Sequence, residues 1–304
     1  MIRSIAVLLF VLPVAVAAFL DALMPEASRE RVQRTPALSP LEVNASDELE
    51  AFFAGLGYGW PPAEDGSVPP IAVTALPADF DRLPVRQRKA LFFRTLAPLV
   101  AAENRRIREQ RALLLQAFSG SAALEGEERA RIERIASHYN VAGDVNDPGV
   151  RRKLLRRVDV IPAALVLAQA ANESGWGTSR FAKEANNLFG MWTWDRSRGI
   201  EPRERAANAS HYVRVFDNLQ EAVANYLHTI NVGAAYGELR SLRAKAREQG
   251  EPLSPWILAG GLSSYSARGE AYVREIRSII RANALDQLPT LVLQATDPDE
   301  AVAP

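Results

Sequence analysis

Glu173 stands where a carboxyl group could act as an acid. It follows the apolar stretch of residues 161–171 and precedes Gly175, a combination typical of the end of a buried helix. In the last turn of such a helix, burial, the helix dipole and the nearby indole of Trp176 would all disfavour the charged carboxylate. A carboxylic acid that stays protonated near neutral pH is what general-acid cleavage of a glycosidic bond requires. Glu-Ser-Gly alone also fits an ordinary helix end with its carboxylate in solvent.

The composition argues against several other kinds of site. The sequence has 36 basic and 36 acidic residues and no net charge, which argues against a nucleic-acid-binding protein. It has no cysteine, so disulfides, thiolate metal sites and a cysteine nucleophile are excluded. Its three histidines, His138, His211 and His228, show no paired metal-binding spacing, and no GxSxG serine motif occurs. We therefore expect neither a metal ion nor a cofactor.

The N-terminus carries an export pattern. Arg3 precedes an uninterrupted apolar run of 16 residues, from 5 to 20. This length is at the upper end for a signal peptide and slightly short for a membrane-spanning helix. Residues 1–20 are therefore predicted to be a signal peptide or a membrane anchor. Either interpretation places the rest of the chain outside the cytoplasm.

Composition and periodicity divide the rest of the chain into four parts. Residues 21–82 hold eight prolines and are predicted to be a linker with at most short elements, including a loop at the glycines of residues 55–59. Residues 83–150 are predicted to form a helical extension, in which Pro98 should kink or divide the first helix. Residues 151–285 form the predicted catalytic domain, and residues 286–304 a mobile tail.

The pattern of the predicted catalytic domain indicates helices around one short sheet. Alternation over residues 211–216 predicts a strand, paired in a hairpin with residues 198–202. The predicted fold class is therefore mostly α, of the α+β type, with a small β-hairpin lobe. Apart from the central helix that ends near Glu173, helices are expected at residues 125–139, 148–158, 178–185, 219–231, 234–249, 255–260 and 269–281.

Several motifs follow one another in order around Glu173. They read Ala-Asn-Glu173-Ser-Gly-Trp-Gly177, Asn-Asn187-Leu-Phe-Gly190, Arg214-Val-Phe-Asp217, Ala235-Tyr236 and Gly261-Leu-Ser-Ser-Tyr265. Together they resemble the bacterial glucosaminidase domain of glycoside hydrolase family 73 (mannosyl-glycoprotein endo-beta-N-acetylglucosaminidase-like), and within it the Bax-like branch. The resemblance covers roughly residues 151–285.

The resemblance implies a lysozyme-like fold and an enzyme that cleaves the β-1,4 bond after N-acetylglucosamine in peptidoglycan. It implies that Glu173 is the general acid and that Tyr236 supports the catalytic site. Aromatic rings stack well on sugars, although a buried ring or a turn-forming amide is often structural instead. The side chains that we assign to substrate binding are Asn187, Phe189, Trp192 and Tyr265.

A second carboxylate is expected across the groove from Glu173. The hairpin region offers Glu201, Glu204 and Asp195, and we favour Glu201 because it lies near the predicted hairpin tip. An exposed loop glutamate without a catalytic role is the alternative. In that case the N-acetyl group of the substrate could assist, or Tyr236 could position the attacking water.

The sequence thus predicts a peptidoglycan hydrolase that is periplasmic or membrane-anchored and faces the cell wall. Its expected partners are peptidoglycan glycan strands and, through the N-terminal segment, the membrane. Two alternatives stay open. One is a lytic transglycosylase, which leaves a 1,6-anhydro sugar, and the other is a non-catalytic glycan-binding or scaffold module tethered to the membrane.

Overall fold

The computed structural model describes residues 38–202 and 210–295, and helices account for most of them. The predicted mostly helical fold class is therefore confirmed. The predicted export segment of residues 1–20 lies outside the described residues. Within the described ranges, no helix combines the length and the apolar character needed to cross a membrane. The helices are α2 (Ser46–Gly55), α3 (Val85–Ser119), α4 (Gly126–His138), α5 (Pro148–Arg157), α6 (Ala163–Ser174), α7 (Arg180–Ala185), α8 (Leu219–Val232), α9 (Gly237–Glu248), α10 (Pro255–Gly260) and α11 (Glu270–Ala282).

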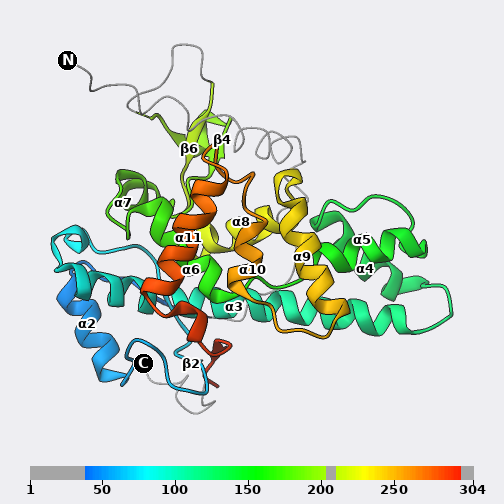
Figure 1. Cartoon of the computed structure of the whole chain (residues 1–304), viewed down its shortest axis with the longest axis horizontal. Helices are drawn as coiled ribbons and strands as arrows, with labels where there is room; N and C mark the ends of the chain where they lie inside the picture. Colours follow the sequence, from blue (N-terminus) through cyan, green and yellow to red (C-terminus); the bar gives the residue numbers. More distant parts are fainter. Residues whose placement is uncertain (1–37, 203–209, 296–304) are drawn as a thin grey trace.

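Helix α6 is the central helix of the structure. Nine of its 12 residues are buried, as expected for a helix with no polar face. It packs against α3, α10 and α11, and Figure 1 shows it in the middle of the molecule. The end of α6 therefore lies among several elements that can supply side chains to one site.

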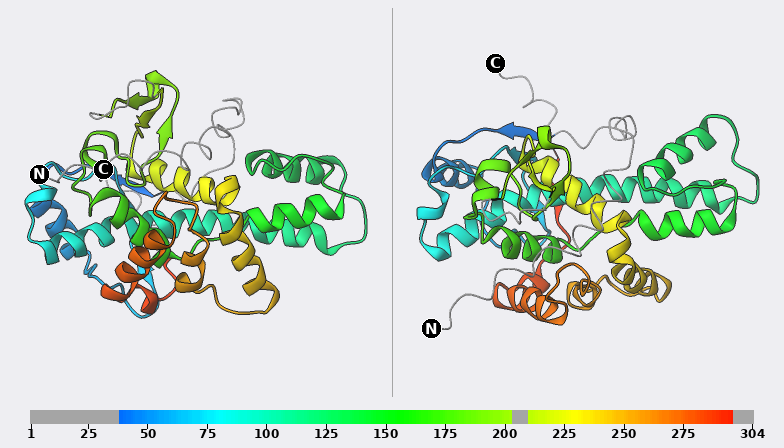
Figure 2. Two further views of the ribbon diagram at one scale, coloured as in Figure 1. Left: turned by 45° about the horizontal axis from the view of Figure 1, so that its top comes forward. Right: turned by 90° about the horizontal axis from the view of Figure 1, so that it is seen from above.

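Helix α3 links the N-terminal half of the chain to this centre. It is 35 residues long and packs against α6 and α8 as well as against α4 and α5. Figure 2 shows α4 and α5 beside the far end of α3, where the three helices extend to one side of the molecule. Residues 83–150 thus share a hydrophobic core with residues 151–285.

The β structure is confined to short strands. The largest sheet has three strands in the order β4-β6-β5, with β4 (Trp192–Thr193), β5 (Gly199–Ile200) and β6 (Tyr212–Arg214), and both pairings are antiparallel. Pairing of β5 with β6 confirms the predicted hairpin. This sheet forms a lobe at one end of the molecule, at the top of Figure 1.

The segment expected to be a linker is packed on the core over residues 38–82. It forms α2, β1 (Ser39–Leu41), β2 (Ser67–Val68) and β3 (Ile71–Val73), with β1 paired to β3 in parallel. Leu49, Phe53 and Phe80 are fully buried in the main core. The linker prediction is therefore wrong for these residues, because apolar side chains between the prolines bury enough surface to hold short elements in place.

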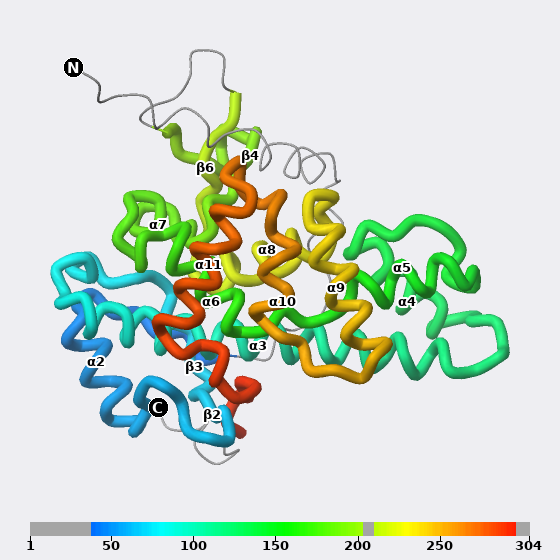
Figure 3. The backbone as a smooth tube through the Cα atoms, viewed as in Figure 1, coloured from blue at the N-terminus to red at the C-terminus, as the bar shows by residue number. Residues whose placement is uncertain are grey.

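The tail prediction is wrong for residues 286–295. These residues include β7 (Val292–Leu293), which pairs in parallel with β2 and packs against α3. Figure 3 shows this last stretch of the described chain running beside β2. The acidic residues at 297–300 suggested a solvated tail, but the apolar Leu291 just before β7 is buried and anchors the segment.

Pro98 does not divide α3. A proline has no N–H, so the carbonyl of Arg94 one turn earlier loses its helical hydrogen bond. The hydroxyl of Tyr58 donates to that carbonyl at 3.3 Å. Tyr58 comes from the loop of residues 55–59, where it is buried rather than exposed. A side chain from the N-terminal segment thus takes the place of the missing N–H and lets the helix continue.

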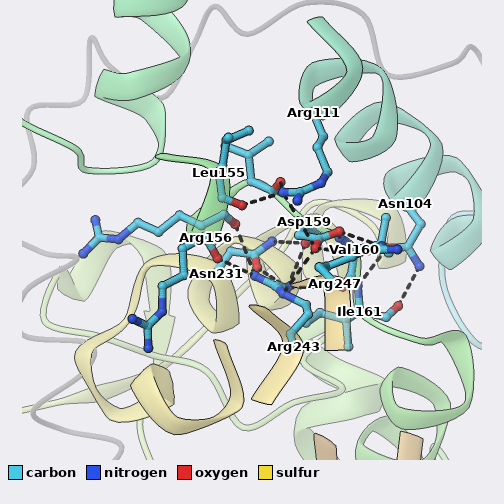
Figure 4. A network of polar contacts seen from close by, with 12 residues as sticks. Asn104, Arg111, Leu155, Arg156, Asp159, Val160, Ile161, Asn231, Arg243 and Arg247 are labelled. Carbon is cyan, nitrogen blue, oxygen red and sulfur yellow. Dashed lines mark hydrogen bonds and ion pairs between the residues drawn. The ribbon is translucent and has the colours of Figure 1, made fainter. Parts of the chain in front are cut away.

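A charged cluster fixes the start of α6 (Figure 4). Asp159, in the connection from α5 to α6, is buried and receives two hydrogen bonds from Arg247 of α9, at 2.9 and 3.0 Å. Arg243, also on α9, donates to the backbone carbonyl of Asp159 at 2.9 Å. Asn104 of α3 binds both the N–H and the carbonyl of Ile161, at 3.2 and 2.8 Å. The cluster joins α3, α5 and α9 to the residues that lead into α6.

Candidate active site

The end of α6 is a tight turn that fixes the position of Glu173. The Oγ of Ser174 donates to the carbonyl of Ala170 at 2.6 Å and accepts from the N–H of Gly177 at 2.9 Å. Gly175 ends the helix in the left-handed conformation, with φ of 57°, which glycine adopts at little steric cost. The Glu-Ser-Gly sequence is thus explained locally: serine and glycine build the turn, and the glutamate side chain remains available.

Trp176 anchors this turn to α3. The backbone N–H of Trp176 donates to the carbonyl of Ala171 at 2.9 Å. Its ring packs edge to face against Phe92 and Phe93, and the ammonium group of Lys89 lies 4.2 Å from the ring centroid. The packed indole therefore holds Trp176, and with it the turn that follows Glu173, against the core.

The turn that contains Asn187 lies next to Glu173. The Nδ2 of Asn187 donates to the carbonyls of Met191 and Arg214, at 2.7 and 2.8 Å, and its Oδ1 accepts from the N–H of Met191 at 2.9 Å. Gly190 has φ of +65°, and a methyl group placed on it would lie 3.8 Å from Oε2 of Glu173. Asn187 thus holds the turn in shape, and the turn comes close to the carboxyl group.

Four buried tyrosines surround the carboxyl group. The rings of Tyr265 and Tyr272 are stacked with centroids 5.1 Å apart, and Tyr236 lies 5.8 Å from Tyr265. Tyr226 is stacked on Phe189 at 4.0 Å, and the hydroxyl of Tyr265 donates to the Phe189 carbonyl at 2.8 Å. Burial raises the pKa of all four hydroxyls, and so does the nearby charge of the carboxyl group. They are therefore neutral hydrogen-bonding groups at ordinary pH.

A buried glutamine connects two of these tyrosines. The hydroxyl of Tyr226 donates to Oε1 of Gln169, and Nε2 of Gln169 donates to the hydroxyl of Tyr272 at 2.9 Å. The Tyr272 hydroxyl also lies close enough to Glu173 to lower the pKa of its carboxyl group. None of Gln169, Tyr226 and Tyr272 was predicted as a site residue from the sequence. The available signal was Gln169 itself, since it is the only polar side chain in residues 161–171 and a buried amide needs partners.

The environment of Glu173 favours its protonated form. Burial raises the pKa of its carboxyl group, and hydrogen bonds from Tyr272 and Asn172 partly oppose the rise. The charge of Glu275 raises the pKa further, whereas that of Arg268 lowers it. The net shift is upward, in the direction expected from the sequence. Because the side chain is still partly exposed, a ligand could reach the carboxyl group.

The β lobe carries the remaining predicted residues. Trp192 lies on β4, where its ring is stacked on His211 with centroids 3.6 Å apart. Glu201 directly follows β5 and is exposed, and Arg180 of α7 donates to its backbone carbonyl at 2.9 Å. The lobe therefore carries both Trp192, which is half-buried, and Glu201, which is exposed.

The other two acids that were considered in this lobe differ from Glu201. Asp195 accepts hydrogen bonds from the N–H and the hydroxyl of Ser197, at 2.9 and 2.7 Å, which hold a short helical turn. These hydrogen bonds also lower the pKa of Asp195. Glu204 lies outside the described residues. Asp195 thus has a structural role in the β lobe.

The structure gathers most of the predicted site residues around Glu173. Tyr236, Tyr265, Phe189 and the turn of Asn187 all belong to this surrounding shell, while Glu201 and Trp192 lie in the β lobe. Their roles toward a substrate stay predictions. Across the described ranges, no group of three or more histidine, aspartate and glutamate side chains is arranged to hold a metal ion.

Comparison with known proteins agrees with this geometry. Residues 150–285 match the glucosaminidase family, described as mannosyl-glycoprotein endo-beta-N-acetylglucosaminidase. The chain is thus similar to this family over residues 150–285. It is similar to "Protein bax" of Escherichia coli (strain K12), with 34% identity over 193 residues. The match covers 61% of this chain and 66% of that protein, slightly less than two thirds of its length. No solved structure matches the chain.

Proposed function

We propose that the protein is a peptidoglycan hydrolase that cleaves the β-1,4 bond after N-acetylglucosamine, with Glu173 as the general acid. The observation that carries this proposal is the partly exposed carboxyl group of Glu173, whose pKa is raised by burial, within a shell of buried tyrosines. The similarity of residues 150–285 to the glucosaminidase family supports a glycan as the class of substrate.

In this mechanism, the protonated Glu173 donates its proton to the glycosidic oxygen as the bond from that oxygen to the anomeric carbon breaks. The departing sugar leaves as an alcohol, a water molecule adds its oxygen to the anomeric carbon, and the proton that this water loses passes to a base, the role for which Glu201 is proposed below. A buried acid with a raised pKa suits this step, because it keeps its proton to a higher pH than an ordinary glutamate and can release it to the leaving oxygen. The tyrosine hydroxyls, being neutral, can donate hydrogen bonds without adding charge.

Substitution of Glu173 tests the proposal. Glu173→Gln keeps the shape of the side chain but has no acidic proton, so we expect lysis of purified peptidoglycan to fall by at least about 100-fold. Glu109→Gln, at an exposed ion pair of α3, is the matched control and should keep wild-type activity. A wild-type protein that binds glycan but releases no products would contradict the proposal and favour a non-catalytic binding module.

The second carboxylate is tested in the same assay. We propose Glu201 for this role, because it directly follows β5 and is exposed on the β lobe. Glu201→Gln should lower the rate by about tenfold or more, whereas Asp195→Asn should not. An unchanged rate in Glu201→Gln would remove Glu201 from the mechanism and leave assistance by the N-acetyl group or water positioned by Tyr236.

The products separate hydrolysis from its nearest alternative. A hydrolase of this specificity leaves a reducing N-acetylglucosamine end, while a lytic transglycosylase leaves a 1,6-anhydro sugar. Mass spectrometry of the digest distinguishes the two, and an anhydro product would overturn the hydrolytic mechanism.

We further propose that the chain is exported and acts on the cell wall, either in the periplasm or from a membrane anchor. The apolar run of residues 5–20 supports this placement.

A further inference from the structure

Gln169 is a fully buried amide in an otherwise apolar part of α6. It is 0% exposed and lies four residues before Glu173, so both side chains are on the same face of the helix. Burying an amide costs free energy unless its polar atoms are hydrogen-bonded. A leucine or methionine would fill this position in a helix that served only as core, so the amide calls for an explanation.

The hydrogen bonds of Gln169 impose a direction on its neighbours. The amide nitrogen can only donate, so the hydroxyl oxygen of Tyr272 is the acceptor in their 2.9 Å contact. The proton of Tyr272 must then point to another acceptor, and the nearby carboxyl group of Glu173, whose pKa the Tyr272 hydroxyl lowers, is in place to accept it. Tyr226 donates to the amide oxygen and so fixes which end of the amide faces Tyr272.

We propose that Gln169 is a positioning residue, which orients the hydroxyl of Tyr272 so that it donates its proton to Glu173. This inference rests on the proposed role of Glu173 as general acid. One carboxyl oxygen of Glu173 then accepts from Tyr272, and the acidic proton resides on the other oxygen, where a glycosidic oxygen can receive it. Loss of the donated bond would also make Glu173 a weaker acid, since hydrogen bonds to the carboxylate lower its pKa.

Gln169→Glu gives the sharpest test. A protonated glutamate has the size of glutamine, with one oxygen that accepts from Tyr226 and one hydroxyl that donates to Tyr272. Once ionised it can only accept, so it competes with Glu173 for the proton of Tyr272. We expect near wild-type kcat at acidic pH and a loss of about tenfold or more as pH rises and the new carboxyl group ionises. KM should stay within about twofold, because a buried side chain cannot touch the substrate.

Gln169→Met removes both hydrogen bonds at every pH. We expect its kcat to be reduced by about tenfold without the rescue at acidic pH that Gln169→Glu shows. The matched control is Gln110→Glu, in a second glutamine–tyrosine pair where Gln110 accepts from Tyr139 at 2.9 Å, away from α6. It should leave the pH profile unchanged. A Gln169→Glu profile that parallels wild type would overturn the proposal.

A measurement independent of activity keeps this inference separate from the proposed function. The pKa of Glu173 can be followed by NMR of ¹³C-labelled carboxyl groups in the wild type and the Gln169 variants. We expect it to rise in Gln169→Glu and in Gln169→Met, and to rise no further when Tyr272→Phe is combined with Gln169→Met. An unchanged pKa overturns the role of Gln169 even if the enzyme is active. A risen pKa supports it even if the wild type shows no hydrolysis.

Discussion

At the scale of single residues, Glu173 is held in a state that costs the protein stability. Burial raises the pKa of its carboxyl group above the ordinary value of 4.5. Between 4.5 and the raised value, the folded protein binds more protons than the unfolded chain. The free energy of unfolding therefore falls as pH rises through that window and remains lower above it. Such a cost is typical of catalytic groups, whose arrangement favours reaction over stability.

Glu173→Gln should consequently be as stable as the wild type at pH 4 and more stable at pH 8. The amide cannot ionise, so it avoids the burial of a charge. We expect the melting temperature of Glu173→Gln to exceed that of the wild type at pH 8 by about 1–3 °C. Calorimetry at both pH values tests this expectation. A melting temperature that falls equally at both would show that Glu173 stabilises the fold and has no cost to relieve.

At the scale of elements, the sequence predicted what local patterns determine. Apolar periodicity located α4, α5, α8, α10 and α11 closely, and Gly175 marked the end of α6 correctly. The prediction failed where distant segments of the chain interact. Nothing near Pro98 in the sequence shows that Tyr58 will donate to the Arg94 carbonyl. Likewise, nothing in residues 286–295 shows that β7 will pair with β2.

The candidate site shows the same division. Glu173 and its turn were recognisable because the whole Glu-Ser-Gly turn is local. The hydrogen-bonded chain through Gln169 joins α6 to Tyr226 of α8 and Tyr272 of α11, which are 57 and 103 residues away along the chain. Periodicity places each tyrosine on the buried face of its own helix, but the partners of its hydroxyl depend on how the helices pack.

The contact between Tyr58 and α3 allows a double-mutant test. Tyr58→Phe leaves the Arg94 carbonyl without its donor and should cost about 1–2 kcal/mol in the free energy of unfolding. In a Pro98→Ala background, the restored N–H of residue 98 can take that carbonyl, so the same substitution should cost about 1 kcal/mol less. Chemical denaturation of the four proteins measures the coupling. Equal costs in both backgrounds would mean that the hydroxyl does not compensate for Pro98.

At the scale of the whole molecule, the Asp159 cluster joins the parts of the chain that position α6 (Figure 4). Burial alone would raise the pKa of Asp159, yet the hydrogen bonds from Arg247 and the charges of Arg243 and Arg111 hold it below its usual value. Arg243 is itself buried, which lowers its pKa to about 10, so it stays charged at neutral pH. One carboxylate thus balances several guanidinium groups from α3 and α9, at the entrance to the helix that ends in Glu173.

Asp159→Asn should therefore destabilise the protein strongly. Removing one partner of a buried ion pair leaves the others uncompensated, and we expect the free energy of unfolding to fall by about 3 kcal/mol. Glu133→Gln, which breaks the exposed Arg129–Glu133 pair of α4, is the matched control and should cost less than about 1 kcal/mol.

The folded pKa of Asp159 is lowered, so the contribution of its carboxylate to stability is present above the unfolded pKa and is lost as pH falls through the folded pKa. The stability difference between wild type and Asp159→Asn should accordingly persist from neutral pH down to about pH 4 and shrink only below it. A difference that already vanishes at pH 6 would mean that the cluster does not hold Asp159 ionised, and that the start of α6 is fixed by its apolar packing alone.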